Sequence, residues 1–427
     1  MTADTIYALS SGSPPAAVAV VRISGPAADS ALETLAGRLP EPRRASLANL
    51  SWAGEHLDEA LVLRFPGPGS ATGEDLAELH LHGGRAVVAA VLGALGRVPG
   101  LRAAEPGEFT RRAFENGRID LLEAEGLADL LEAETQSQRR AAMALAGGGL
   151  SRIVEDWQMR LLELSAELEA TIDFSDEGEM AEGLPPQWGR GCEALADDFG
   201  MLLARPPAER LREGVRVVIA GPPNAGKSSL LNWLAGRQAA ITSAVAGTTR
   251  DLVEAPTAIG GAPFLLIDTA GLRECDDEVE AIGVRRARDV VEAADLILWL
   301  GPPADCPERE KALIVESKGD LLTARRSPDV DVRVSSQTGE GMTGLIELLI
   351  GRARALLPKE GEVAIAARQR GLITDAQSAL RSACGSVDPL LAAEALRVGR
   401  LALDRLTGRS GVENMLDALF ARFCIGK

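Results

Sequence analysis

Residues 215–229 read VRVVIAGPPNAGKSS, and this stretch decides how the middle of the chain folds. Val215–Ala220 is a near-continuous apolar run, as in a strand of a parallel sheet that is buried on both faces. Gly221–Ser228 then fits G-x-x-x-x-G-K-[ST], in which glycines let the backbone wrap closely around phosphate groups. A helical pattern follows, and its N-terminus supplies N–H donors and a positive dipole. This order predicts a phosphate-binding loop, with Lys227 on the β- and γ-phosphates and the Ser228 hydroxyl on Mg²⁺.

The sequence on either side of this loop shows three different patterns of apolar and polar residues. Residues 1–118 mix short β-like runs with alanine-rich helical pieces, the pattern of an α+β domain. Residues 119–213 and 357–427 carry apolar residues at helical spacing. Strands and helices alternate over residues 214–356, as in a doubly wound α/β domain. We therefore predict a multidomain α+β and α/β chain, in which a Ras-like P-loop domain is inserted between two halves of a discontinuous helical domain.

Composition limits the classes of protein that fit the chain. Hydrophobic residues make up 46% and charged residues 25% of the 427 residues, as in soluble folded proteins. The formal net charge of −17 argues against binding nucleic acid through a broadly basic surface, so an RNA substrate would need a local patch or a partner subunit. The five cysteines include no CxxC pair, and the N-terminal stretch has no basic region or long apolar span. We expect no signal peptide, no membrane helix and a cytoplasmic location.

Three further elements indicate that the nucleotide is a guanine nucleotide. The loop Gly247–Asp251 holds Thr248 and Thr249, and a mobile threonine of this kind can join Mg²⁺ and sense the γ-phosphate. Asp268–Gly271 follows an apolar strand, so its Asp can hold the water shell of the metal while its Gly N–H meets the γ-phosphate. Ser317–Asp320 follows another strand, and Asp320 could accept two hydrogen bonds, from the guanine N1–H and exocyclic amine, that adenine cannot donate. Ser335 and Ser336 are placed to support the guanine O6 through a backbone N–H. Together these elements predict a GTPase.

Two positions depart from the usual pattern of GTPases. Leu272 stands where Ras-type enzymes place a water-positioning Gln, so the water orienter and the extra positive charge must come from elsewhere. Ser317 stands where Asn is usual, and its shorter hydroxyl loses the two-sided bonding of Asn to the base and the phosphate loop. We expect guanine selectivity to survive through Asp320, with weaker affinity.

The whole chain resembles the MnmE (TrmE) family of bacterial tRNA-modifying GTPases. The motifs that carry the likeness run from one end of the sequence to the other: Val21–Gly25, Gly73–Asp75 with Glu78 and His82–Gly84, Pro106–Phe114, Asn116–Leu121, the phosphate loop, Ala246–Asp251, Asp268–Arg273 and Phe423–Lys427. A match at both termini and in the middle is more specific than a phosphate loop alone.

The resemblance implies an architecture and an activity. The N-terminal domain would be similar to folate-binding aminomethyltransferase folds, would form a homodimer and would hold a tetrahydrofolate derivative (5,10-methylene- or 5-formyl-). With a separate FAD-binding partner of the MnmG/GidA type, the chain would install a 5-carboxymethylaminomethyl-type group on the wobble uridine of certain tRNAs. The folate would donate the one-carbon unit, and K⁺-dependent GTP hydrolysis would drive a conformational change.

The family's functional positions carry over residue by residue. Folate contacts would fall on Arg22, Glu78, Arg118 (where the family commonly has Lys) and the terminal Lys427, and the catalytic glutamate on Glu280, with Arg273 as a possible helper. Mg²⁺ would take Ser228 and Thr249, and K⁺ would take Asn224, Ser243, Val245 and Thr248. The nucleotide contacts would be Asn224, Ala225, Gly226, Lys227, Ser228, Ser229, Ser243, Ala244, Val245, Ala246, Gly247, Thr248, Thr249, Asp268, Thr269, Ala270, Gly271, Ser317, Lys318, Asp320, Ser335 and Ser336.

Several alternatives stay open at the level of sequence. Cys424 is either a functional thiol near the folate or an inert one, and Arg22 with Glu78 could be a surface salt bridge. A ribosome-assembly GTPase is the rival class, although such proteins usually append a basic RNA-binding module and the tail here is helical. A P-loop kinase or ATPase fits poorly because of the guanine-reading Asp320.

Overall fold

The computed structural model of the chain describes residues 4–173, 186–236, 253–269, 289–321, 327–359, 361–410 and 413–426. The chain forms two compact units, Met1–Ala128 with Asp404–Lys427 and Asp129–Leu403. The second unit is therefore enclosed in the sequence by the two segments of the first.

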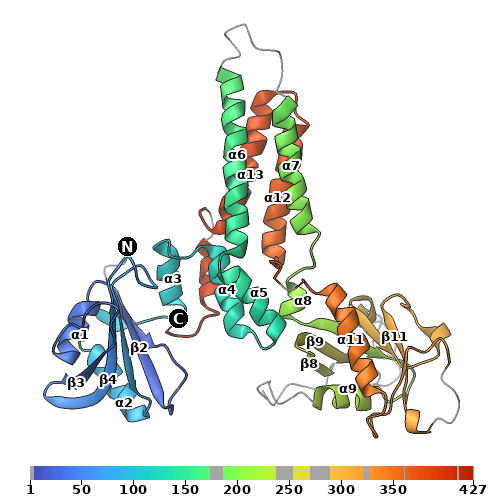
Figure 1. Ribbon diagram of the computed structural model, residues 1–427, viewed down its shortest axis with the longest axis horizontal. Helices are drawn as coiled ribbons and strands as arrows, with labels where there is room; N and C mark the ends of the chain where they lie inside the picture. Colours follow the sequence, from blue (N-terminus) through green and yellow to red (C-terminus); the bar gives the residue numbers. More distant parts are fainter. Residues whose placement is uncertain are drawn as a thin grey trace, which may run out of the picture. The chain divides into compact units, whose positions relative to one another are not determined.

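The first unit contains a mixed sheet in the order β3-β4-β5-β2-β1-β6 (Figure 1). Alternate residues of β2, including Ala19, Val21 and Ile23, are fully buried in one core with α1 and α2. The opposite face of β2 carries Arg22, because successive side chains of a strand point to opposite faces. The elements are β1 (Thr5–Leu9), β2 (Val18–Ser24), α1 (Ala28–Ala36), β3 (Ser46–Trp52), β4 (Glu55–Phe65), β5 (Leu76–His82), α2 (Arg85–Leu95) and β6 (Leu101–Ala103).

A second, smaller core of this unit joins the two ends of the chain. It brings Leu121 and Ala124 of α4 (Leu121–Glu132) against Leu416 and Phe420 of α14 (Glu413–Phe420). The short helix α3 (Glu108–Glu115) precedes α4 and contacts α14. The C-terminal segment is thus built into the N-terminal unit.

The helical part of the second unit uses segments from both sides of the inserted α/β domain. Helices α6 and α7 come before that domain and α12 and α13 after it, and Figure 1 shows the four side by side. Trp157 of α6 packs edge-on against Phe199 of α7 with ring centroids 4.3 Å apart, and the buried Trp188 donates its indole N–H to Leu164 O at 2.8 Å. The bounds are α5 (Gln136–Ala146), α6 (Gly149–Asp173), α7 (Pro186–Leu203), α8 (Glu209–Arg212), α12 (Ala367–Cys384) and α13 (Pro389–Thr407).

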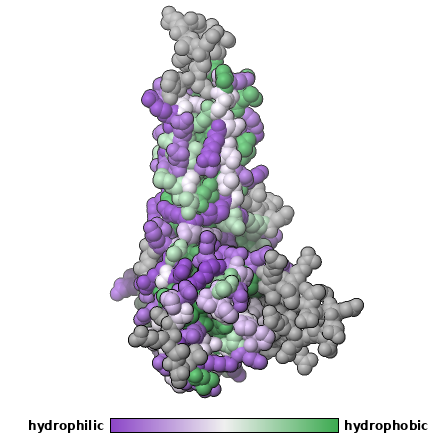
Figure 2. Space-filling view, turned by 90° about the vertical axis from the view of Figure 1, so that its right-hand side faces the viewer, coloured by the Kyte–Doolittle hydropathy of each residue, from purple (hydrophilic) through white to green (hydrophobic). Residues whose placement is uncertain are grey.

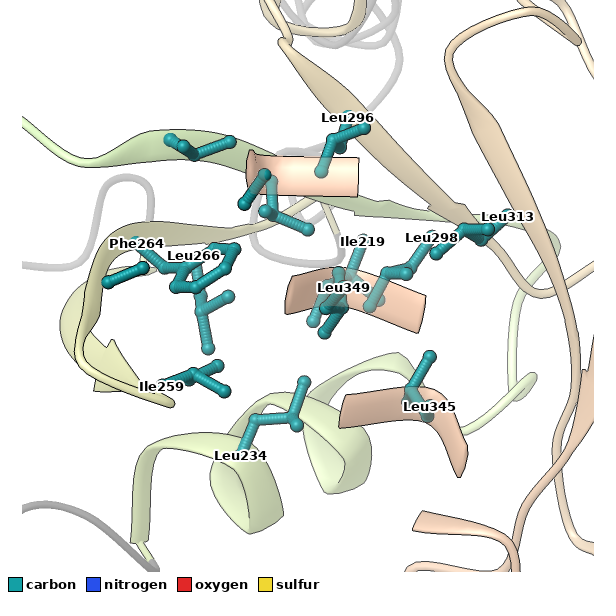
Figure 3. Packing of buried hydrophobic residues seen from close by; sticks show 14 of the residues in the cluster. Ile219, Leu234, Ile259, Phe264, Leu266, Leu296, Leu298, Leu313, Leu345 and Leu349 are labelled. Atoms are coloured by element: carbon teal, nitrogen blue, oxygen red, sulfur yellow. The ribbon is translucent and has the colours of Figure 1, made fainter. Parts of the chain in front are cut away.

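The inserted domain has a six-stranded sheet in the order β12-β11-β10-β7-β9-β8. All neighbouring strands are parallel except β8 and β9, which form an antiparallel hairpin. Figure 3 shows apolar side chains of the sheet, such as Leu266 and Leu298, packed with Leu234 of α9 and Leu345 of α11. The elements are β7 (Val215–Ala220), α9 (Lys227–Gly236), β8 (Val253–Ile259), β9 (Ala262–Asp268), β10 (Leu296–Trp299), β11 (Ala312–Glu316), β12 (Val332–Arg333) and α11 (Met342–Leu356).

The predicted fold class is confirmed: an N-terminal α+β part, a helical region made from two chain segments and an inserted P-loop α/β domain are all present. Along the helical bundle in Figure 2, hydrophilic and intermediate residues are interspersed with separate hydrophobic ones. None of the helices in the described ranges has the length and apolarity needed to cross a membrane.

Candidate functional site

The phosphate loop has the backbone geometry that its glycines predict. It connects the buried strand β7 to α9, and both Gly221 (φ 146°) and Gly226 (φ 93°) lie where a side chain would be strained. A Cβ on Gly221 would also meet backbone atoms of Leu300 at 3.0 Å. Lys227 is 7% exposed and donates to Gly221 O and Pro222 O at 3.2 and 3.0 Å, so its ammonium lies over the loop. The loop can receive phosphate groups in this conformation.

Two predicted magnesium-site residues meet at the carboxyl ends of neighbouring strands. Ser228 Oγ donates to Asp268 Oδ2 at 2.6 Å, and Asp268 pairs in register with Ile219 of β7. Thr269 is held beside them, because its N–H and its hydroxyl both donate to Ile219 O. Hydroxyl and carboxylate oxygens are the ligands that Mg²⁺ prefers, directly or through water, so this pair fits the ion.

The predicted base-recognition segment, Ser317–Asp320, is tied to the phosphate loop by two side chains. Ser317 Oγ donates to Ala225 O at 2.5 Å, and Lys318 Nζ donates to Asn224 O at 2.7 Å. Asn224 and Lys318 both have positive φ angles, 61° and 57°, so the two loops meet in an unusual backbone conformation. Asp320 follows, exposed to solvent in the short 3₁₀ helix Gly319–Leu321. The shorter Ser317 thus keeps the contact to the phosphate loop that the usual Asn makes.

The second segment predicted to bind the guanine base, Ser335 with Ser336, lies in a tight turn after β12. Ser335 is fully buried, its N–H donates to Glu340 O at 2.9 Å and its hydroxyl accepts from Thr338 N. Because the N–H of Ser335 is engaged inside the turn, we expect Ser336 to be the backbone donor to a guanine O6.

A large part of the predicted nucleotide and cation site lies outside the described residues. This holds for the first switch loop, for most of the second, for both catalytic candidates and for the terminal lysine: Ser243, Ala244, Val245, Ala246, Gly247, Thr248, Thr249, Ala270, Gly271, Arg273, Glu280 and Lys427. Their roles stay predictions. Ser229 is described and is exposed in the first turn of α9.

The predicted folate residues of the N-terminal sheet lie together. Arg22 of β2 and Glu78 of β5 are register partners, and Arg22 Nη2 lies 2.8 Å from Glu78 Oε1. The pair is mostly buried, with side chains 26% and 17% exposed. The guanidinium of Arg22 also lies over the ring of Phe109 at 5.8 Å, which attaches it to α3. The structure therefore joins an ion pair, an aromatic ring and a sheet face in one place.

Arg118 reaches this region from the end of α3. It is exposed, and a Cβ on Gly73 would lie 3.2 Å from its Cγ. Gly73 has a φ of 79° and belongs to the loop of residues 70–75 that precedes β5, so only a glycine fits between Asn116 and Arg118 without strain. Loop and arginine are packed against each other.

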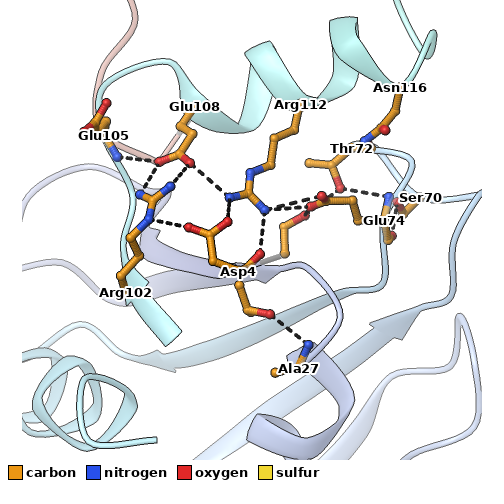
Figure 4. A network of polar contacts seen from close by, with 12 residues as sticks. Asp4, Ala27, Ser70, Thr72, Glu74, Arg102, Glu105, Glu108, Arg112 and Asn116 are labelled. Atoms are coloured by element: carbon orange, nitrogen blue, oxygen red, sulfur yellow. Dashed lines mark hydrogen bonds and ion pairs between the residues drawn. The ribbon is translucent and has the colours of Figure 1, made fainter. Parts of the chain in front are cut away.

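A buried polar network fixes this loop to α3 and to β1 (Figure 4). Arg112 has a side chain only 3% exposed and contacts the carboxylates of Asp4, Glu74 and Glu108 at 2.9, 3.1 and 3.0 Å. Burial acts to raise the pKa of Glu108, but hydrogen bonds from Arg102, Arg112 and the N–H of Glu105 outweigh it and leave this pKa below its usual value. Glu108 is therefore charged and hydrogen-bonded at neutral pH.

Glu74, Glu108 and Arg112 lie within sequence motifs that predicted no individual role for them. One signal was available, because Glu108 and Arg112 are four residues apart and such a pair faces one side of a helix. The contacts with Asp4 and Glu74 join positions far apart in the chain and had no local signal.

The C-terminal tail docks beside the start of α3. Ile425 forms an antiparallel bridge with Pro106, and Gly107 (φ 72°) is so close to Phe420 that a Cβ would lie 2.2 Å from its carbonyl oxygen. Gly426 packs in the same way on Leu9 at the end of β1. Cys424 is a free, exposed thiol in this docked segment.

Comparisons with known proteins agree over the whole chain. Two family models match, "GTP-binding protein TrmE N-terminus" over residues 5–118 and "MnmE helical domain" over residues 121–424. The "tRNA modification GTPase MnmE" of Rhizorhabdus wittichii is 59% identical over 429 residues, covering 99% of this chain and 97% of that protein. That of Novosphingobium aromaticivorans is 55% identical, covering 99% and 100%. Among solved structures, the G domain of the T. maritima FeoB iron transporter is 27% identical over 33% of this chain and 98% of its own, with a TM-score of 0.25.

Proposed function

The chain belongs to the MnmE family of tRNA modification GTPases, and from this we propose that it modifies the wobble uridine of certain tRNAs at the expense of GTP. With an FAD-binding partner of the MnmG/GidA type, it installs a 5-carboxymethylaminomethyl-type group in the cytoplasm. A tetrahydrofolate derivative, 5,10-methylene- or 5-formyl-, supplies the one-carbon unit. The observation that carries this proposal is the presence in one chain of a nucleotide site and of the Arg22–Glu78 site.

The division of labour along the chain is part of the proposal. Residues 1–118 bind folate and form the homodimer, and residues 214–356 form the GTPase domain. Residues 119–213 and 357–427 form the helical domain, although its last segment, Asp404–Lys427, packs in the N-terminal unit. The outer face of the N-terminal sheet supports a homodimer, because Val18, Leu47 and Leu61 on its strands are 54%, 58% and 38% exposed.

Mg²⁺ would be held through Ser228 and Asp268, joined by Thr249, and would neutralise charge on the phosphates during GTP hydrolysis. K⁺ would be held by Asn224, Ser243, Val245 and Thr248 and would supply the positive charge of an arginine finger. Glu280 would orient the attacking water, helped by Arg273. The exposed position of Asn224 in the phosphate loop supports the cation site.

The cation part is tested by GTP hydrolysis rates in K⁺ and in Na⁺ at equal ionic strength. We expect faster turnover in K⁺, and equal rates would refute the K⁺ site. Glu280→Ala should keep GTP binding and lose turnover, so a fully active variant would remove Glu280 from the mechanism.

The folate part is tested by isothermal titration of the full chain with 5-formyl-tetrahydrofolate. Binding should be weakened roughly tenfold or more in Arg22→Ala, because a charged hydrogen-bond donor is lost. Arg44→Ala is the matched control, since Arg44 is a highly exposed arginine of the same unit that pairs with Glu41. Absence of binding to the unaltered chain, together with co-sedimentation with ribosomal subunits, would favour the rival ribosome-assembly function.

A further inference from the structure

We propose that Arg112 is the positioning residue of the folate site: without touching the ligand, it holds the loop of residues 70–75 and α3 so that Arg22 and Arg118 face one ligand. This proposal rests on the proposed function, because it concerns the same site. It assigns a role to a residue that lies beneath the site and is nearly inaccessible to solvent.

Arg112 is connected through Glu74 to β2, the strand of Arg22. Arg112 Nη1 donates to Glu74 Oε2 at 3.1 Å, and Ser24 Oγ donates to the same carboxylate oxygen at 2.8 Å. Ser24 is two residues after Arg22 on β2, so the two side chains lie on the same face of the sheet. Ser24 and Thr72 are almost completely buried and hydrogen-bonded to each other at 2.7 Å. The end of β2 therefore moves with Glu74, and Glu74 with Arg112.

The loop of residues 70–75 is also connected to Arg118. Asn116 Nδ2 donates to Thr72 O at 2.8 Å, so the loop is tied to the C-terminal end of α3 as well as to its middle. Arg118 N donates to Ala113 O at 2.8 Å, which fixes the chain directly after the helix. Because Gly73 packs on the Arg118 side chain, a shift of the loop relative to α3 changes where this guanidinium points.

Arg112 also joins the helix α3 to the start of β1. Arg112 Nη1 donates to Asp4 O and Nη2 to Asp4 Oδ1, so α3 is joined to the segment that begins β1. Phe109, three residues before Arg112 on the same helix, carries the ring under Arg22. One guanidinium with a rigid planar set of donors thus holds the loop, the helix and β1 together, and a lysine ammonium cannot reproduce that geometry.

The test compares Arg112→Lys with Arg111→Lys. Arg111 is the preceding residue of the same helix, 41% exposed, and pairs at the surface with Glu115 and Asp417. Isothermal titration with 5-formyl-tetrahydrofolate separates two effects. A positioning role raises the dissociation constant roughly tenfold or more at unchanged stoichiometry, whereas a purely structural role lowers the number of binding sites and leaves the constant unchanged.

Asn116→Ala provides a second, milder break in the same connection, in case Arg112→Lys does not fold. It should also raise the dissociation constant, and GTP hydrolysis should stay at the level of the unaltered chain in every variant, because the nucleotide site is built from other elements. Unaltered folate affinity in both Arg112→Lys and Asn116→Ala would overturn the positioning role. If the unaltered chain binds no folate, or Arg22→Ala binds it equally well, it is the proposed folate function that fails.

Discussion

Replacing Ser317 with alanine removes the hydrogen bond that ties the base-recognition segment to the phosphate loop. The hydroxyl of Ser317 donates to Ala225 O at 2.5 Å and is half-buried, so water replaces it only in part. A neutral hydrogen bond of this kind contributes about 0.5–1.5 kcal/mol net. We therefore expect the affinity for both GTP and GDP to fall by about two- to tenfold, since 1.4 kcal/mol corresponds to tenfold.

The effect should appear in binding and not in the chemical step. Ala225 belongs to the loop that is predicted to surround the phosphates common to both nucleotides, whereas the predicted catalytic residue Glu280 lies elsewhere in the sequence. Turnover at saturating GTP should then stay within about twofold of the unaltered chain. Equilibrium titration with fluorescent GDP and GTP analogues measures the affinity, and a steady-state phosphate-release assay measures the turnover.

Two further variants test whether the Ser317 hydroxyl contributes to nucleotide affinity. Ser386→Ala removes a serine hydroxyl that donates to Asp388 O in an exposed turn before α13, and it should leave nucleotide affinity unchanged. Ser317→Asn restores the longer amide, which can bond to the loop and to the base together, and should bind nucleotide more tightly. If Ser317→Ala binds GTP and GDP as tightly as Ser386→Ala does, the contact with Ala225 does not contribute to nucleotide affinity.

Three other outcomes are expected. Leu345→Ala, at a fully buried position of α11, should lower the free energy of unfolding by about 2–5 kcal/mol, measured by urea denaturation, because it leaves a cavity against the central sheet; an unchanged midpoint would contradict the packing. Gly107→Ala should weaken docking of the C-terminal segment, because its Cβ would overlap the carbonyl oxygen of Phe420; faster proteolysis after α14 would reveal this, and unchanged proteolysis would count against it. Glu108 has a lowered pKa in the folded chain, so its stabilising effect is complete above the ordinary value of 4.5 and is lost as pH falls through the folded value. Melting temperature should therefore drop on acidification below about pH 4.5 less steeply in Glu108→Gln than in the unaltered chain, and parallel curves would exclude this contribution.

The sequence alone determined the nucleotide site wherever its parts are local. A strand, a glycine loop and a helix follow one another within residues 215–229, and the structure has these elements at the expected places. Asp268 and Ser317 each follow an apolar run, and the carboxyl ends of parallel strands meet at one edge of a sheet. Local sequence patterns were therefore enough to predict that Ser228 and Asp268 lie close together.

Other features of the site required the tertiary structure, because they join residues that are distant in the sequence. Arg22 and Glu78 are 56 positions apart and meet only through the register of β2 and β5. Arg112 contacts Asp4 across 108 positions, and its neighbour Arg111 contacts Asp417 across 306. No periodicity or motif spacing reports such a pairing, since a buried arginine and an exposed one have the same letter and similar neighbours in a helix.

Features that the sequence predicts differ physically from features that only the tertiary structure shows. Hydrophobic periodicity and glycine positions follow from the geometry of a single strand, turn or helix, so the sequence determined the order of the elements and the phosphate loop. The buried network around Arg112 forms only when three separate segments exclude water together, because the cost of burying its charges is offset by partners from all of them. That cooperative arrangement, which positions Arg22 and Arg118 in our proposal, was decided by the tertiary structure.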